Sequence, residues 1–475
     1  MKDRVRIICI DIFLVITTCI AALSYFIAVV AGEVSYMIGN DNTWPFAILI
    51  TVGWFATVVL CLLERFVLPH LANKRLDVLR TGWHQLLTFL VSCTIVSMFC
   101  IYGMLGKMSL YVNHGEAMII IPGIKDGMRT WILVLVCLVG AEALVFWNGM
   151  LRIFFTSEQL AIKWRVIAVL CGLIPLVNLT VLVKMMIITG EEIDFEQDRI
   201  LRDEKRKSEQ VCKTKYPIFM VHGIFFRDFE HLNYWGRIPK ALEENGATIY
   251  YGDHMSSASI EKSAEELVRK LQILCEERHF DKVNVIAHSK GGLDMRYAIS
   301  KLGADKYVAS LTTINTPHRG CIFAEYLLNK IPKEARNTIA DKYNEIFRKL
   351  GDEDPNFFEG VSNLTFGFCE QFNKEVKDVK GIMYNSVGSK LNRATNGRFP
   401  LNMSHPLVKH FDGENDGLVG EDSFKWGSKY TYLTVKGRRG ISHADMIDLN
   451  RENIPGFDVR EFYINLVHDL KNKGF

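Results

Sequence analysis

The N-terminal part of this chain is far more apolar than the rest, and this asymmetry limits the folds available to it. Long apolar runs recur between Arg6 and Thr189, whereas the sequence after Gly190 has the mixed composition of a water-soluble domain. A helix needs about 20 apolar residues to cross a bilayer, and five runs are long enough. We therefore predict an α-helical multi-pass membrane domain at residues 1–189. Its predicted transmembrane helices are Ile7–Ala31, Trp44–Leu63, Leu86–Leu105, Trp131–Leu151 and Val166–Ile188.

Basic residues are concentrated in alternate connections of this predicted domain. They precede the first span and follow the second and the fourth, whereas the first loop, Gly32–Thr43, contains none. Because Lys and Arg favour cytoplasmic loops, the N-terminus is predicted to be cytoplasmic. Five crossings of the cell membrane would then place the C-terminal half on the extracellular side. The basic residues counted are Lys2, Arg4, Arg6, Arg65, Lys74, Arg75, Arg80, Arg152, Lys163 and Arg165.

Two polar features of the N-terminal part have structural interpretations. Glu142 lies near the middle of the fourth predicted span, where a carboxylate usually has a partner, and we expect a packing contact with Asn178. Residues 190–214 carry dense charge of both signs, with apolar residues at near-helical intervals. We predict a solvated helical connector there. The sequence indicates no oligomeric state.

Composition excludes other classes of site. The 11 cysteines show no metal-ligand spacing, although a disulfide among the four in the C-terminal half stays possible. The formal net charge of +3 favours no polyanionic partner, and no nucleic-acid-binding pattern is present.

From Lys215 to Phe475, short buried strands alternate with helices, a pattern typical of a mostly parallel sheet covered by helices on both faces. Strands are predicted at 218–221, 248–251, 282–286, 308–314, 381–387 and 430–435. Helices are predicted near 235–245, 260–277 and 459–472.

A serine lies between the third of these strands and the helix that follows it. The sequence there is Ala287-His288-Ser289-Lys290-Gly291, with Gly292 next. Small residues around a serine at a strand-to-helix turn are typical of a nucleophile elbow, in which the strained backbone exposes the hydroxyl above the sheet. The helix N-terminus then favours negative charge beside the serine. An ordinary Gly-rich turn is the structural alternative.

Acyl transfer also needs donors for the oxyanion. His222-Gly223 follows the first strand, where such folds place one backbone donor, and Gly223 permits close approach of the substrate. The predicted oxyanion donors are the N–H groups of Ile224 and of Lys290, the residue after the serine. A plain strand-ending turn would explain His222-Gly223 equally well by itself.

A general base and a carboxylate complete a serine triad, in the chain order Ser, acid, His. His443 lies in the loop before the final helix and is the predicted base. Asp416, followed by Gly417 in a tight turn, is the predicted acid. The competing acids are Asp412 and Asp422, and the other downstream histidines are His318, His405, His410 and His468.

Five stretches of the C-terminal half resemble the bacterial triacylglycerol lipases of the α/β-hydrolase superfamily, particularly those of pseudomonads. The resemblance implies Ser289 as nucleophile, His443 as base and Asp416 as its partner, with Ile224 and Lys290 as oxyanion donors. Ala287 departs from the usual Gly and is similar to a variant in some Gram-positive lipases. The stretches are 216–223, Tyr234-Trp235, 283–289, 316–320 and 415–420.

These lipases often carry structural calcium near the catalytic histidine, and Asp445 resembles one of its ligands. Residues 394–409 contain no Asp or Glu to supply the second carboxylate, and calcium prefers about six to eight oxygens. A capping role for Asp445 is therefore the preferred reading, and no cofactor is expected to be required. The stretch 321–372 is too long for a simple connection and is predicted to form a helical cap over the serine.

The sequence thus predicts a membrane-anchored serine hydrolase that cleaves carboxylic esters of lipid-like substrates, with the bilayer and an acyl ester as its partners. Acyl transfer to another hydroxyl would use the same triad. A non-catalytic membrane sensor or transport protein with a hydrolase-like binding domain is an alternative of a different class, because fold alone does not prove activity.

Overall fold

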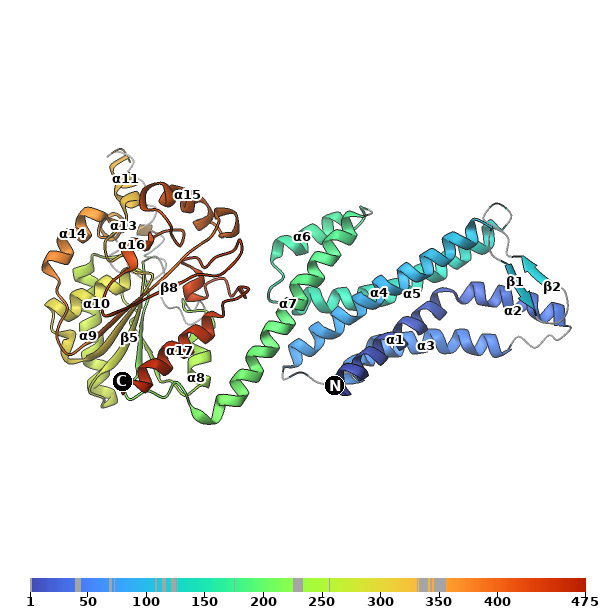
Figure 1. Ribbon diagram of the computed structural model, residues 1–475, viewed down its shortest axis with the longest axis horizontal. Helices are drawn as coiled ribbons and strands as arrows, with labels where there is room; N and C mark the ends of the chain where they lie inside the picture. The colour runs from blue at the N-terminus through green and yellow to red at the C-terminus, as the bar shows by residue number, and fades with distance from the viewer. Residues whose placement is uncertain are drawn as a thin grey trace. The chain divides into compact units, whose positions relative to one another are not determined.

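The structure is a computed structural model and divides into two compact units, Met1–Arg202 and Asp203–Phe475 (Figure 1). It describes residues 2–38, 44–67, 71, 73–106, 109–112, 117–120, 125, 127–174, 176–224, 234–255, 257–330, 332, 341, 344–345 and 356–475.

The first unit consists mainly of helices. Two of them, α4 and α5, approach closely where Gly82 faces Gly149, since a Cβ on Gly82 would lie 2.9 Å from the Gly149 carbonyl oxygen. An antiparallel strand pair, β1 and β2, was not predicted. The elements are α1 (Lys2–Ala22), α2 (Ser24–Ile38), α3 (Trp44–Val67), α4 (Lys74–Met104), β1 (Ser109–Val112), β2 (Ala117–Ile120), α5 (Met128–Thr156), α6 (Ile162–Cys171) and α7 (Val177–Arg206).

The described helices contain fewer candidate spans than the five predicted. Three are long and apolar enough to cross a membrane, within α3, α4 and α5. A fourth would be the pair α1 and α2, which is bent by 64°. The predicted fifth span, Val166–Ile188, is divided between α6 and α7, because the helix stops after Cys171 near Gly172 and Leu176 adopts a φ of 66°.

Polar contacts within this unit correct two expectations. Glu142 on α5 accepts a hydrogen bond from Ser92 Oγ of α4 at 2.9 Å, so its observed partner is Ser92 and not Asn178, whose amide donates to the carbonyl oxygen of Gly172. Glu192, in the stretch expected to be solvated, is buried on α7. Its carboxylate accepts a hydrogen bond from Ser157 Oγ at 2.6 Å, so this part of the predicted connector is packed against the turn that follows α5.

The second unit contains a six-stranded sheet in the order β4-β3-β5-β6-β7-β8, and every pairing is parallel. The predicted fold class of the C-terminal half, a mostly parallel sheet with helices on both faces, is confirmed. The strands are β3 (Ile218–Val221), β4 (Ile249–Tyr251), β5 (Val283–His288), β6 (Val308–Ile314), β7 (Met383–Ser389) and β8 (Lys429–Leu433). The longer helices are α8 (Ile238–Glu244), α9 (Ile260–Arg278), α10 (Lys290–Lys301), α11 (Ile322–Lys330), α13 (Phe357–Ser362), α14 (Phe366–Glu375), α15 (Leu401–Asp412) and α17 (Val459–Asn472), with the short α16 (Glu421–Phe424) before β8.

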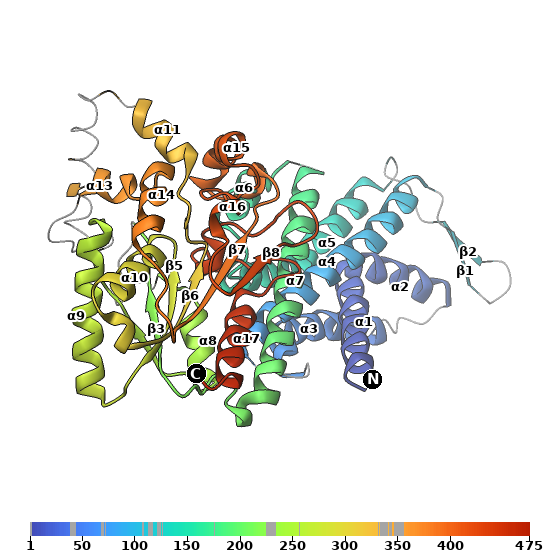
Figure 2. The same ribbon diagram turned by 60° about the vertical axis from the view of Figure 1, so that its left-hand side comes forward.

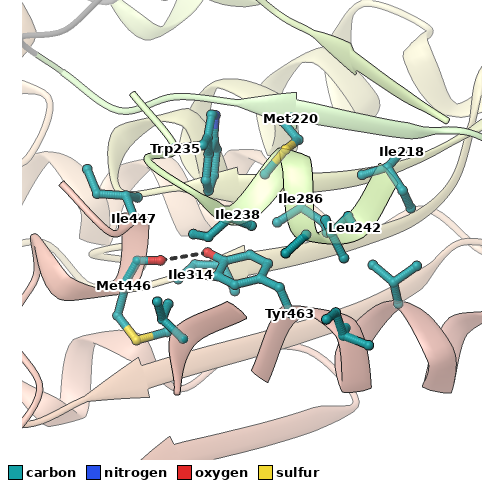
Figure 3. Close-up of a cluster of buried hydrophobic side chains, with 14 of the residues drawn as sticks. Ile218, Met220, Trp235, Ile238, Leu242, Ile286, Ile314, Met446, Ile447 and Tyr463 are labelled. Atoms are coloured by element: carbon teal, nitrogen blue, oxygen red, sulfur yellow. Dashed lines mark hydrogen bonds between the residues drawn. The ribbon is translucent and has the colours of Figure 1, made fainter. Parts of the chain in front are cut away.

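Apolar side chains along β3 point alternately to the two faces of the sheet, which explains why helices cover both faces. Ile218 and Met220 belong to a hydrophobic cluster with α8 and α17, whereas Phe219 and Val221 belong to a second cluster with α9 and α10. Figure 2 shows these helix pairs on opposite sides of the sheet. In the first cluster, Tyr463 donates a hydrogen bond to the Met446 carbonyl oxygen at 2.9 Å (Figure 3).

Three helices, α11, α13 and α14, lie in the region predicted as a cap. Part of that prediction, including Ile339, Tyr343, Ile346 and Phe347, falls outside the described residues. The cap therefore stays a prediction.

Candidate active site

Ser289 follows β5 directly and precedes α10, and its backbone has φ 54° and ψ −130°. A non-Gly residue rarely adopts positive φ, and such strain is concentrated at functional sites. The Ser289 N–H donates to the Ile314 carbonyl oxygen at 2.9 Å, and its own carbonyl accepts from Thr316 Oγ1 at 2.7 Å. Both ends of the strained peptide are thus held by the neighbouring strand β6 and the turn after it.

The small residues after the serine are required by close packing. A Cβ on Gly291 would lie 2.4 Å from the His222 carbonyl oxygen, and one on Gly292 would lie 2.2 Å from Thr316 Oγ1. Ala287 is fully buried within β5. The turn therefore brings the start of α10 against the loop after β3.

His443 Nδ1 lies 2.6 Å from Asp416 Oδ2, and both side chains are buried. Because an ionised carboxylate only accepts hydrogen bonds, Nδ1 carries the proton and Nε2 is left as the basic nitrogen. Asp416 also accepts N–H groups from Leu418 and Val419 at 2.9 Å, through Oδ1. Its carboxylate is thereby held in one orientation.

The competing acids and histidines have other partners. Asp412 accepts the backbone N–H groups of Ile322 and Phe323 at the start of α11, and Asp422 is exposed. His318 contacts Thr313 Oγ1, and His405 contacts the Leu391 carbonyl oxygen. His410 is exposed, and His468 lies in the terminal helix α17.

The histidine before the serine connects the elbow to the other loops. The His288 ring centroid is 4.5 Å from that of His443, and His288 Nδ1 lies 2.6 Å from the Tyr234 hydroxyl. That hydroxyl also accepts the N–H of Gly223 at 3.0 Å. Burial, together with the neighbouring His443 and His222, holds the pKa of His288 well below its usual range. His288 is therefore neutral and adds no charge beside His443.

The two predicted oxyanion donors are the N–H groups of Ile224, in the loop after β3, and of Lys290, at the start of α10. The Gly223 N–H is used by Tyr234, and Ile224 is the next residue along the loop. Lys290 is the first residue of α10, so its N–H has no intrahelical acceptor. The side chain of Lys290 is fully buried, and its Nζ lies 2.8 Å from Asp294 Oδ1 and 3.1 Å from Ser263 Oγ.

A buried polar cluster continues beneath this turn. His254 Nε2 lies 3.3 Å from Asp294 Oδ2, and the His222 ring stacks on His254 at 4.4 Å. Burial raises the pKa of Asp294 to about 6 despite the nearby Lys290 ammonium. Burial, then His254, lowers the pKa of His222 to about 3.

Sequence reasoning missed two residues that shape the site. Asn315 follows β6 with φ 48°, and its amide donates to Asp416 Oδ2 at 2.6 Å and to Ser389 Oγ at 2.7 Å. Asp294, one turn into α10, neutralises the buried Lys290. The signal available for Asn315 was its position directly after a buried strand, at the sheet edge where Ser289 also lies.

Asp445, which resembles a calcium ligand but was predicted to have a capping role, contacts nitrogen donors. Its Oδ1 accepts from Arg439 Nη2 at 2.9 Å and its Oδ2 from the Ser442 N–H at 2.7 Å. Within the described part of the chain, no group of three or more His, Cys, Asp or Glu residues is placed to hold a metal ion. All 11 cysteines are free thiols, so no disulfide forms in the C-terminal half.

Comparison with known proteins shows that the C-terminal half is similar to triacylglycerol lipases and to a thioesterase family. Residues 217–358 match the palmitoyl protein thioesterase family. A triacylglycerol lipase of Pseudomonas fragi is 26% identical over 296 residues, covering 55% of this chain and 98% of that protein. Triacylglycerol lipase 2 of Saccharomyces cerevisiae is 28% identical over 259 residues, covering 51% of this chain and 75% of that protein. A triacylglycerol lipase of Vibrio cholerae is 35% identical, but the match covers only 25% of this chain and 38% of the lipase.

Among solved structures, the mature lipase BlEst2 of Bacillus licheniformis aligns with a TM-score of 0.41 and 22% identity, over 54% of this chain and 92% of that one. The predicted resemblance of the C-terminal half to triacylglycerol lipases is confirmed by the sequence homologues. These homologues support a carboxylic-ester hydrolase of the lipase and esterase class.

Proposed function

We propose that this chain is a membrane-anchored serine hydrolase that cleaves carboxylic esters of lipid-like substrates. The observation that carries the proposal is the buried contact between His443 Nδ1 and Asp416 Oδ2, at the same sheet edge as the strained Ser289. A nucleophile, a base and an orienting carboxylate in this chain order are the requirements of acyl transfer. The lipase homologues support an acyl ester as the substrate.

In the proposed reaction, Ser289 Oγ attacks the ester carbonyl carbon while His443 Nε2 takes the hydroxyl proton. Asp416 stabilises the imidazolium that forms. Collapse of the tetrahedral intermediate breaks the ester C–O bond, and the alcohol leaves with the proton from His443. Water then attacks the acyl-serine, with His443 again taking and returning a proton, and the carboxylic acid is released. These steps use no cofactor.

The oxyanion would accept hydrogen bonds from the N–H groups of Ile224 and Lys290. Since the Lys290 side chain is bonded to Asp294 and Ser263 beneath the turn, its ammonium is directed away from the serine. The backbone N–H is then what Lys290 offers to the substrate. One such donor typically contributes about 10²–10³-fold to kcat.

A fluorophosphonate probe tests the proposal, because it reacts only with an activated serine. The full-length protein in detergent should be labelled, and labelling should be lost in Ser289→Ala but kept in Ser208→Ala, which alters an exposed serine. Release of free fatty acid from a long-chain ester would identify water as the acyl acceptor. An unlabelled wild type, or labelling that survives Ser289→Ala, would refute the proposal and favour a non-catalytic membrane protein.

Thioester cleavage is a second candidate, favoured by the match of residues 217–358 to palmitoyl protein thioesterases. The same triad would release a thiol in place of an alcohol. Comparing kcat/KM for a palmitoyl ester and a palmitoyl thioester separates the two. A preference for the thioester of tenfold or more would assign the chain to this second reaction.

The proposal includes anchoring by the apolar helices, with the N-terminus in the cytoplasm and the hydrolase unit outside. Three described helices meet the length and composition of a span. The bent pair α1 and α2 would add a fourth crossing. With that pair in the membrane, an external hydrolase unit requires a fifth crossing, by the segment that contains α6 and α7. A reporter fused after Phe475 tests this, since activity of the reporter in the cytoplasm would reverse the proposed side.

A further inference from the structure

The loop that carries His443 is held by an ionic cluster that none of the proposed chemical steps uses. Asp445, two residues after His443, is buried and accepts the Ser442 N–H at 2.7 Å. Its other oxygen accepts from Arg439 Nη2 at 2.9 Å. The residues on both sides of His443 are therefore linked through one carboxylate.

Arg439 reaches a second carboxylate with the same guanidinium. Its Nη2 lies 2.7 Å from Glu452 Oε2, and Arg398 is also bonded to Glu452. Burial alone would raise the pKa of Glu452, but its hydrogen bonds to Arg398 and Arg439 outweigh this and lower it. The cluster thus contains two guanidinium groups and two carboxylates, and their formal charges cancel.

This charge balance does not fit a calcium site. Both oxygens of Asp445 are occupied by N–H donors, which a cation would have to displace, and the two arginines of the cluster carry permanent positive charges. Calcium prefers about six to eight oxygen ligands, whereas the described residues around Asp445 provide a second carboxylate, Glu452, that is already paired with two arginines. A divalent ion here would add charge to a cluster that is already neutral.

We infer that Arg439 is a positioning residue that fixes the His443 loop without a divalent cation. The inference rests on the proposed function, because it concerns the base of the proposed triad. The guanidinium of Arg439 crosslinks Asp445 and Glu452, and Asp445 in turn accepts the Ser442 N–H. The His443 N–H then donates to the Asp416 carbonyl oxygen at 2.9 Å, so the loop that Arg439 holds also sets the register of base and acid.

The geometry explains why an arginine occupies this position. Nη2 of Arg439 bonds both carboxylates, and its two N–H donors lie in the rigid plane of the guanidinium, whereas an ammonium is a single flexible point charge. Displacing a catalytic group by about 1 Å can cost about 10²-fold in rate. Loss of Arg439 is therefore expected to reduce kcat and leave KM within about twofold.

The test compares Arg439→Ala, Arg439→Lys and the matched control Arg438→Ala, which alters the exposed neighbouring arginine, in the full-length protein in detergent. We expect kcat on a p-nitrophenyl ester to fall about 10²-fold in Arg439→Ala, to recover partly in Arg439→Lys, and to be unchanged in Arg438→Ala. Added guanidinium ion should raise the activity of Arg439→Ala and not that of the wild type.

Titration calorimetry with CaCl₂ should show no binding to the wild type, and EGTA should change neither the melting temperature nor the activity of the wild type.

Two outcomes would overturn the inference and leave the proposed function intact. One is a wild type that stays labelled at Ser289 yet binds calcium and loses activity in EGTA. The other is an Arg439→Ala variant as active as Arg438→Ala. If Arg439→Ala does not fold, Arg439→Lys and Glu452→Gln test the inference in its place. Both variants should lower kcat without a matching rise in KM. Failure of the probe to label the wild type would instead refute the proposed function.

Discussion

The Tyr234 hydroxyl bridges Gly223 and His288, two residues on adjacent strand ends, accepting the Gly223 N–H at 3.0 Å and lying 2.6 Å from His288 Nδ1. One phenol thereby connects the loop that carries one proposed oxyanion donor to the turn that carries Ser289. The relative positions of these two loops depend on side chains brought together only by folding.

Replacing Tyr234 by Phe should impair both stability and catalysis. The substitution leaves a buried N–H and a buried imidazole nitrogen without their common partner, a loss of about 1–3 kcal/mol in the free energy of unfolding. Release of the loop at Gly223 should lower kcat more than it changes KM. Pulse proteolysis in urea and ester kinetics measure the two effects, with Tyr326→Phe, a half-exposed tyrosine on α11, as control. Unchanged kinetics would separate this bridge from catalysis.

Asp416→Asn should abolish most activity while the fold is retained. The amide can still accept the Leu418 and Val419 N–H groups, but it no longer holds the His443 tautomer with a basic Nε2. By comparison with other serine triads, kcat should fall about 10⁴-fold. Asp412→Asn, which alters a carboxylate that caps α11, should lose far less. A variant that keeps a tenth of the wild-type activity would show that Asp416 is not the orienting acid.

Acid should destabilise the hydrolase unit through His222. Its pKa is lowered to about 3 in the folded state by burial and by His254, against about 6.5 when unfolded. Between these two pKa values, His222 binds more protons in the unfolded chain than in the folded one. Its contribution to the free energy of unfolding is therefore fully present above pH 6.5 and declines as the pH falls toward 3. The loss between pH 7 and pH 5 is about 2 kcal/mol from this residue alone.

The pH effect can be assigned by substitution. Pulse proteolysis at pH 7 and pH 5 should show a smaller difference for His222→Gln than for the wild type, while His410→Gln, at an exposed position, should behave as the wild type. An equal pH dependence in all three proteins would mean that His222 does not cause the loss.

Gly291→Ala should destabilise the elbow, because the new Cβ would lie 2.4 Å from the His222 carbonyl oxygen, a backbone atom. Overpacking of this kind costs about 1–3 kcal/mol, and the shift should also lower the rate of fluorophosphonate labelling. Gly367→Ala on α14 is the matched control, since its Cβ would meet only side-chain atoms of Glu325, at 3.5 Å or beyond. Labelling of Gly291→Ala at the wild-type rate would show that the close packing at Gly291 does not control the reactivity of Ser289.

The sequence by itself determined the parts of the fold that follow from local patterns. Buried apolar runs bounded by turn residues predicted strands such as Val308–Ile314, and the helix Val459–Asn472 was predicted with the observed bounds. The elbow at Ser289 could also be predicted, because its strain is set by neighbouring residues along the chain. Hydrophobic period and turn chemistry act over a few residues and are therefore visible in the sequence.

Only the tertiary structure decided which distant side chains meet. Asn315 reaches Asp416 from 101 residues away. Arg439 is bonded to Asp445, the carboxylate that resembles a calcium ligand, and Ser92 is the partner of Glu142. The apolar run Val166–Ile188 reads as one span, yet it is divided between two helices. Hydrogen bonds and ion pairs between remote residues depend on where the packed elements bring their polar groups, and burial makes an unpaired group costly. No local pattern carries that information.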